Sequence, residues 1–241
     1  MVARISLLLF LSLHAATAPQ PTPDISVLLG ALGTPLCMRN CVSGVADAVQ
    51  DILTFNNVSQ KIKQMCTAYS ATEACLKKKV GCTAKQFYEE ATAGIRYACI
   101  TKKAAFDKEE DCLGPSIDGV LQVCDAKCHV RGNLSTLTAN KFIQRASKLG
   151  GNLWLVAERL ESFCDSLTCI LPCITDGANS ACPKTGWLLL DTLLDPFDKA
   201  ADFFHKAPKG IQDQVKKSLS PKCHFLFDKY GLLEMRKDSY E

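Results

Sequence analysis

The stretch CTAYSATEACLKKKVGCTAKQFYEEATAGIRYACITKKAAFDKEEDC, residues 66–112, shows the plan of the whole chain. Its five cysteines are widely spaced and bracket a segment with helical periodicity. That segment begins at Thr83 with the pattern T-x-x-Q, which satisfies free N–H groups in the first turn of a helix. Apolar side chains then recur at steps of three and four residues as far as Cys99, which places them on one face. The stretch therefore predicts a helix that disulfides hold to its neighbours.

The same periodicity occurs on both sides of this stretch. Apolar residues share one helix face over 37–52, 58–69, 117–128, 142–167, 197–204 and 211–219. β-branched runs with a period of two residues, which would indicate strands, are absent from the sequence. The sequence therefore predicts an all-α fold.

Glycine and proline residues indicate where these helices should begin and end. Gly150-Gly151 predicts a kink or a division into two helices within 142–167. The segment 169–182, which contains proline and glycine, is predicted to be mostly loop. We expect Pro115-Ser116 and Asp195-Pro196 to begin helices, because proline is favoured at the first helical position.

The N-terminus has the pattern of a secretory signal peptide. Arg4 precedes a short apolar run that ends in small residues, and Ala16-Thr17-Ala18 fits a cleavage site. The run is too short to span a membrane. We therefore expect residues 1–18 to be removed from a secreted, extracellular protein, and we expect the proline-rich segment 19–36 to be an extended linker.

All cysteines lie after the predicted signal peptide. An even number of cysteines in a secreted chain indicates a disulfide framework, because thiols oxidise in that compartment. Zinc would require C-x2-C pairs with histidine partners, a pattern that this sequence lacks, so neither metal nor cofactor is expected. The expected disulfide cysteines are Cys37, Cys41, Cys66, Cys75, Cys82, Cys99, Cys112, Cys124, Cys128, Cys164, Cys169, Cys173, Cys182 and Cys223.

The cysteines divide into two runs, each of which begins with C-x3-C. Seven lie in 37–112 and seven in 124–223. We therefore predict either one domain or two coupled helical modules, 37–112 and 113–204, followed by a C-terminal helix and tail, 205–241. Because seven is odd, full pairing within the chain requires at least one bridge between the runs. The alternative is one free thiol in each half, available for bridges between molecules.

Charge and hydropathy exclude some partners. Lysine and arginine total 28 against 25 acidic residues, so the formal net charge is only +3. Nucleic-acid binding would require a concentrated basic patch, and nothing in the sequence indicates one, so no nucleic-acid partner is expected. The apolar run that begins at Trp187 stops at Asp191, so no membrane span is expected.

Four segments carry a resemblance to a known family. They are CMRNC from Cys37, MCTAYSATEACL from Met65, GIRYACITKKAAFDKEEDCL from Gly94 and FCDSLTCILPC from Phe163. In the order and spacing of its cysteines the chain resembles the nematode family built on the chondroitin proteoglycan 4 domain, over 37–204. The resemblance implies a secreted, helical, disulfide-rich domain of the extracellular or eggshell matrix, with a protein or glycan partner that it does not identify.

The founding member of that family carries chondroitin on serines, and attachment uses Ser-Gly in an open chain. The only Ser-Gly here is Ser43-Gly44, which lies at the start of a predicted helix where we expect it to be packed. The sequence departs from the family in this respect. Asn57 and Asn133 begin N-x-S sequons, and we expect at least one of them to carry an N-linked glycan. Asn57 with Gln60 also resembles a helix capping box.

No catalytic motif is present, so we do not expect an enzyme. The contiguous acidic run 107–111 lacks the alternating ligands of a calcium loop and is read as solvated. Lys77-Lys78-Lys79, in a predicted turn between Cys75 and Cys82, could meet a sulfated glycan. The function predicted from the sequence is a secreted matrix or interaction protein.

The alternative is a carrier of a lipid or another small apolar ligand. Its ligand would contact the seam Phe142–Phe163, with Trp154, and the stretch Trp187–Leu194.

Overall fold

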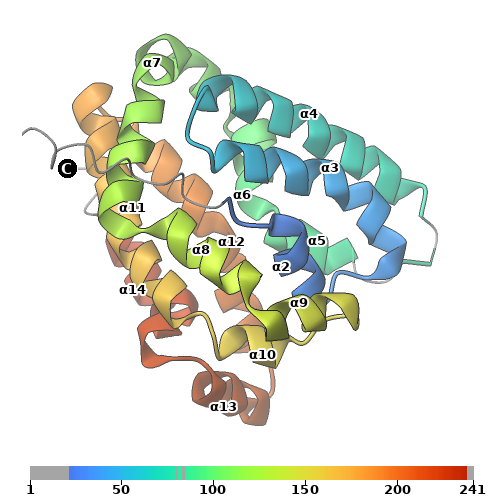
Figure 1. Ribbon diagram of the computed structural model, residues 1–241. Coiled ribbons are helices and arrows are strands. Elements are labelled where there is room, and N and C mark those ends of the chain that lie inside the picture. Colours follow the sequence, from blue (N-terminus) through green and yellow to red (C-terminus); the bar gives the residue numbers. More distant parts are fainter. Residues whose placement is uncertain (1–21, 80, 83–84, 238–241) are drawn as a thin grey trace, which may run out of the picture.

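The computed structural model describes residues 22–79, 81–82 and 85–237, and within them it is built of helices without strands (Figure 1). The all-α prediction is confirmed. The α-helices are α2 (Ile25–Ala31), α3 (Leu36–Ile52), α4 (Val58–Lys77), α5 (Lys85–Ala91), α6 (Ala93–Arg96), α7 (Lys103–Cys128), α8 (Val130–Ala139), α9 (Lys141–Lys148), α10 (Leu153–Ala157), α11 (Glu161–Ala181), α12 (Gly186–Lys206), α13 (Lys209–Ser218) and α14 (Lys229–Lys237). A π-helix, η1 (Tyr97–Thr101), precedes α7, and a 3-10 helix, η2 (Pro221–Phe227), precedes α14.

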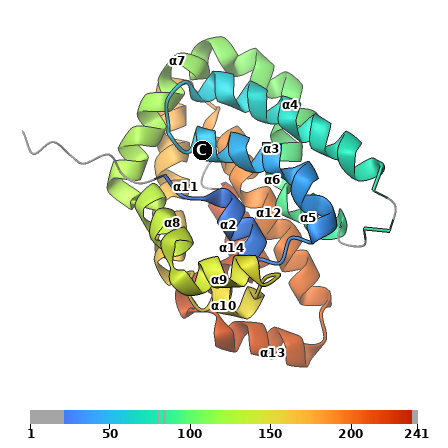
Figure 2. The same ribbon diagram turned by 45° about the vertical axis from the view of Figure 1, so that its right-hand side comes forward.

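Two helix pairs, α3 with α4 and α7 with α11, are each joined by two disulfides and form the frame. Cys37–Cys82 and Cys41–Cys75 hold α3 against α4 and the turn that follows it. Cys124–Cys173 and Cys128–Cys169 hold α7 against α11. Two sulfurs four residues apart lie on one helix face, so each C-x3-C motif can bind one neighbouring element twice. α3 and α4 lie side by side at one end of the molecule, and α9, α10 and α13 lie at the other (Figure 1, Figure 2).

The segment expected to be a linker is largely folded, so the linker prediction for 19–36 is wrong over its described part. Asp24 caps α2 by accepting a hydrogen bond of 3.0 Å from the Val27 N–H, and Ile25 and Ala31 are buried. α2 packs against α9, and the Asn152 N–H donates to the Ala31 carbonyl at 2.7 Å. Burial of this short apolar run outweighs the glycine and proline residues on which the prediction rested.

Proline lies inside helices where the sequence predicted boundaries. Pro115 lies within α7, so no new helix begins there, and Pro172 lies within α11, which replaces the predicted loop 169–182. Asp195-Pro196 is likewise internal to α12. A proline costs a helix one hydrogen bond. In α11 the buried face, which includes Leu171, compensates for that loss.

The helix predicted from Thr83 to Cys99 is broken into α5, α6 and η1. Its cap at Thr83 lies outside the described residues. The helical pattern is interrupted at Gly150-Gly151, as the sequence predicts, and both glycines have φ of +97°. The apolar run 142–167 is divided among α9, α10 and α11. The helix predicted from Pro208 is present as α13, which begins at Lys209.

The capping box predicted at Asn57 does not form. Asn57 is the N-cap of α4 but has the left-handed conformation, with φ of +50°, and its side chain makes no capping hydrogen bond. The carboxylate of Asp118, on α7, instead accepts from the backbone N–H groups of Asn57 at 2.6 Å and Val58 at 2.8 Å. The start of α4, in the first predicted module, is thus fixed by a residue of the second predicted module, which begins at residue 113.

Packing across the predicted module boundary is close. The boundary between residues 112 and 113 falls within α7 rather than at a break between helices. α6 lies against α12, and Gly94 approaches so closely that a Cβ there would be 2.1 Å from the Thr192 carbonyl oxygen. The Tyr97 hydroxyl donates to the Asp191 carboxylate at 2.9 Å across the same contact. The two cysteine runs therefore share helices and core.

Candidate functional site

The structure pairs the cysteines in seven disulfides. Three lie within the first run, Cys37–Cys82, Cys41–Cys75 and Cys66–Cys99. Three lie within the second, Cys124–Cys173, Cys128–Cys169 and Cys164–Cys223. The seventh, Cys112–Cys182, joins the runs, as the odd number in each requires. No cysteine of the described residues is free, so this pairing provides no thiol for bridges to other molecules.

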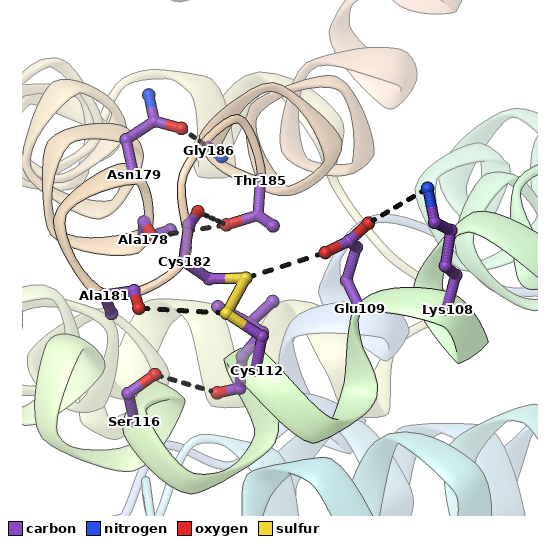
Figure 3. The surroundings of a disulfide bond; sticks show 11 residues. Lys108, Glu109, Cys112, Ser116, Ala178, Asn179, Ala181, Cys182, Thr185 and Gly186 are labelled. Carbon is purple, nitrogen blue, oxygen red and sulfur yellow. Dashed lines mark hydrogen bonds and ion pairs between the residues drawn. A yellow bond between two sulfur atoms is a disulfide. The ribbon is translucent and has the colours of Figure 1, made fainter.

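The inter-run bridge joins the middle of α7 to the end of α11 (Figure 3). Cys182 is only 2% exposed, and the carboxylate of Glu109 lies 3.6 Å from its sulfur. The turn after Cys182 is fixed by the buried Thr185, whose hydroxyl lies 2.6 Å from the Cys182 carbonyl oxygen. The Gly186 N–H donates to the Asn179 side chain at 2.8 Å and leads the chain into α12. The bridge holds the end of α11 to α7, and these hydrogen bonds set the turn from which α12 begins.

The two sequons have different environments. Asn57 is exposed at the start of α4. Asn133 lies in α8, and its amide donates to the Ser162 carbonyl at 3.1 Å and to the Ser166 hydroxyl at 2.8 Å, both on α11. Ser135, the third residue of its sequon, is only 6% exposed.

The charged runs lie on the surface. Lys77, Lys78 and Lys79 are exposed at the end of α4. The acidic run 107–111 is part of α7, where Asp107 pairs with Lys103 at 2.6 Å and Glu110 pairs with Lys63. Among the described residues no group of three or more His, Cys, Asp or Glu side chains is placed to hold a metal ion.

Ser43-Gly44 is not packed, contrary to the expectation from its place after Cys41. Both residues are exposed, and they lie in the middle of α3, where a Cβ on Gly44 would meet no atom within 4 Å. The helix winds so that its buried face carries Val42 and Val45 on either side of this dipeptide. Ser43 is accessible, but it is part of a helix and not of an open chain.

The apolar seam proposed for a carrier forms no single cavity. Ile143 and Val156 are buried in the core, whereas Phe142 and Leu149 are 60% and 74% exposed. In the stretch after Trp187, Leu188, Leu190 and Leu194 are buried. A cavity of about 260 Å³ between α2, α3, α5 and α6 is lined by other residues, including Met38 and Tyr88. The Tyr88 hydroxyl is buried without a hydrogen-bond partner, and burial raises the pKa of Tyr88 above its usual range.

A wide concave surface lies near the C-terminus, between the end of α12, α13, η2 and α14. We call it the C-terminal groove. Its volume is about 630 Å³, and its lining residues are Phe204, His205, Val215, Lys216, Leu219, His224, Phe227, Asp228, Lys229, Tyr230 and Leu233. The sequence predicts only a C-terminal helix and a tail for 205–241. The density of aromatic and basic residues after Phe203 was the signal that could have identified it.

Aromatic rings and aliphatic side chains form the floor of the C-terminal groove. Phe204 is buried, and its ring centroid lies 4.9 Å from that of Phe227. Beneath them the fully buried Cys164–Cys223 bridge fixes η2 to α11. A disulfide at this place limits the freedom of the short helices that bound the groove. The floor is therefore held in shape by a covalent link.

Nitrogen donors stand at the rim. Lys216 lies with its ammonium 5.9 Å from the centroid of the Phe204 ring, and Lys229 pairs with Asp202. The Nε2 atoms of His205 and His224 each lie 3.1 Å from a backbone carbonyl oxygen. Because a carbonyl can only accept, each ring donates through Nε2 and leaves Nδ1 free for another partner. The groove thus combines apolar faces with cationic and polar edges.

An acidic stripe on α12 lies beside the groove. Asp191 and Asp198 both bind Arg236 of α14, the former at 2.6 Å. Asp195 lies between them in sequence, and burial raises the pKa of its carboxyl group. These contacts fasten α14, whose Leu232 is fully buried, to α12 and so fix one wall of the groove.

Comparison with known proteins gives a family and no fold precedent. The chondroitin proteoglycan 4 family matches residues 26–223. The chain is 24% identical over 153 residues to chondroitin proteoglycan 4 of Caenorhabditis elegans, which covers 63% of this chain and 19% of that protein. It is 24% identical over 97 residues to the Caenorhabditis briggsae protein of the same name, covering 39% and 14%. The chain thus spans about a fifth or less of these relatives, and no solved structure matches it.

Proposed function

Because this chain belongs to the chondroitin proteoglycan 4 family, we propose that it is a secreted, non-enzymatic matrix protein that binds an acidic glycan in its C-terminal groove. Its signal-like N-terminus and its disulfides support secretion, since disulfides persist in oxidising compartments. Within the described residues no helix is both long and apolar enough to cross a membrane.

The observation that carries the glycan assignment is the pairing of aromatic faces with cations in the groove. A sugar ring has an apolar face that fits against Phe227 or the 83% exposed Tyr230. Its carboxylate or sulfate needs a charged donor, which Lys216 provides, because hydrogen bonds between ionised groups are stronger than neutral ones. The relatives are named as chondroitin proteoglycans, so an acidic glycan is available where such proteins occur.

The test is retention of the purified full chain on immobilised chondroitin sulfate under a salt gradient. We expect binding that weakens with salt, because ions screen exposed charges. Lys216→Ala should bind about fivefold more weakly, which corresponds to losing on the order of 1 kcal/mol from one exposed ionic contact.

Two matched variants control for the loss of one positive charge. Lys108→Ala removes an exposed lysine of α7, and Lys78→Ala removes one from the turn after α4. Both should elute at the salt concentration of the unaltered protein. Retention that is absent, or that depends on Lys78 and not on Lys216, would show that the groove is not the glycan site.

A further inference from the structure

We propose that the folded, secreted protein carries one N-linked glycan, at Asn57, and that the sequon at Asn133 stays unmodified. The inference requires entry into the secretory pathway, which is part of the proposed function, but it does not depend on the C-terminal groove. It distinguishes two sites that the sequence alone leaves equivalent.

Asn133 is half-buried and is part of a polar link between α8 and α11. Its Nδ2 group donates both hydrogens, to the Ser162 carbonyl at 3.1 Å and to the Ser166 hydroxyl at 2.8 Å. Ser166 is 1% exposed and donates onward to the Cys128 carbonyl at 2.8 Å. A sugar on Nδ2 would replace one of these hydrogens and would stand between two helices that Cys128–Cys169 holds together. A chain glycosylated there cannot form this contact.

Asn57 meets no such conflict. Its side chain is exposed, its left-handed backbone directs the chain around a turn, and Asp118 already satisfies the backbone N–H groups at the start of α4. The amide nitrogen is therefore not needed by the fold. Asn57 lies at the start of α4, and α4 and α13 lie at opposite ends of the molecule (Figure 1).

The reaction is transfer of an oligosaccharide from a lipid-linked diphosphate donor. A bond forms between Nδ2 of Asn57 and the anomeric carbon of the sugar, and the bond from that carbon to the diphosphate oxygen breaks. Nδ2 loses one proton to a base, and the lipid diphosphate leaves. Because transfer precedes folding, the transferase can meet either asparagine. The structure determines which of the glycosylated chains can then reach the folded state.

The experiment expresses the complete chain with its own N-terminus in insect cells and measures intact mass before and after peptide amidase treatment. Protein recovered from the medium should lose the mass of one glycan. The variant Asn57→Gln should show no change on treatment, and Ser59→Ala, which keeps Asn57, should behave identically. Asn133→Gln should lose the same mass as the unaltered protein.

Peptide mapping of the secreted protein then assigns the site. A glycan on Asn133, or an unmodified Asn57, in folded protein from the medium would overturn the inference. If the unaltered protein did not appear in the medium, that result would count against the proposed secretion and not against the glycan assignment. Comparing the amounts of protein in the cell and medium fractions measures this outcome separately. A substantially lower yield of Asn133→Gln alone would support the structural role of the Asn133 amide.

Discussion

Removing the inter-run bridge with Cys112→Ser and Cys182→Ser should lower the free energy of unfolding by about 3–4 kcal/mol. The bridge joins residues 70 apart, so its loss frees a long loop in the unfolded chain. Denaturant titration followed by far-ultraviolet circular dichroism measures the change.

The same titration tests whether the two runs unfold together. Trp154 and Trp187 both lie in the second run, so fluorescence follows that half while circular dichroism follows all the helices. In the unaltered protein the two transitions should coincide, as they do for a single cooperative unit. In the double variant we expect them to separate.

The matched control is Cys37→Ser with Cys82→Ser. This pair also has one exposed and one buried cysteine, but it lies within the first run. The control should lose comparable stability while its two transitions still coincide. Separate transitions in the unaltered protein would show that the halves are independent.

Gly94→Ala should destabilise the protein by about 3 kcal/mol, because the added methyl group must displace α6 from α12. The new Cβ would lie 2.1 Å from the Thr192 carbonyl oxygen and 3.3 Å from a ring carbon of Pro196. Neither neighbour is the end of a flexible side chain, so the backbone has to move. Thermal unfolding under oxidising conditions measures the loss.

Gly119→Ala is the control for the change of residue type. Gly119 lies within α7, and a Cβ there would meet no atom within 4 Å. Alanine favours the helix, so this variant should be stabilised by about 0.5–1 kcal/mol. If the two variants had equal stability, the close contact between α6 and α12 would be wrong.

The cysteine count predicted one important feature of the architecture. Seven cysteines in each run require a bridge between the runs if all are paired, and Cys112–Cys182 is that bridge. Parity could not choose the partners, because pairing depends on which helix ends meet in three dimensions. The match of CDAKC with CILPC, through Cys124–Cys173 and Cys128–Cys169, follows from two antiparallel helices that periodicity cannot orient.

The failures of the sequence rules share one cause, which is burial. Pro115 and Pro172 were expected to mark boundaries, but each lies in a long helix whose apolar face is covered by other helices. The segment before Cys37 was expected to be extended, yet Ile25 and Ala31 complete a core with α9. The helix propensity of a short segment does not show which distant residues will pack against it.

The candidate site was the least predictable part. The C-terminal groove brings Phe204 of α12 together with Lys216 of α13 and Tyr230 of α14. The periodicity of 197–204 and 211–219 predicted helices there, but it could not say how those helices would lie against one another. The position of η2 depends on Cys164–Cys223, a pairing that the sequence leaves open. Lys77-Lys78-Lys79 were expected in a turn that follows Cys75; α4 instead continues to Lys77, and all three lysines are exposed.

Disulfide mapping without reduction tests the coupling of the two runs most directly. Cleavage before aspartate isolates Cys112 in residues 111–117 and Cys182 in residues 176–190, with one cysteine in each peptide. The structure predicts that these two peptides are found joined and that they separate on reduction. Recovery of both as unlinked peptides with free thiols would contradict a covalently coupled molecule. Recovery of either joined to a cysteine of its own run would contradict the Cys112–Cys182 pairing.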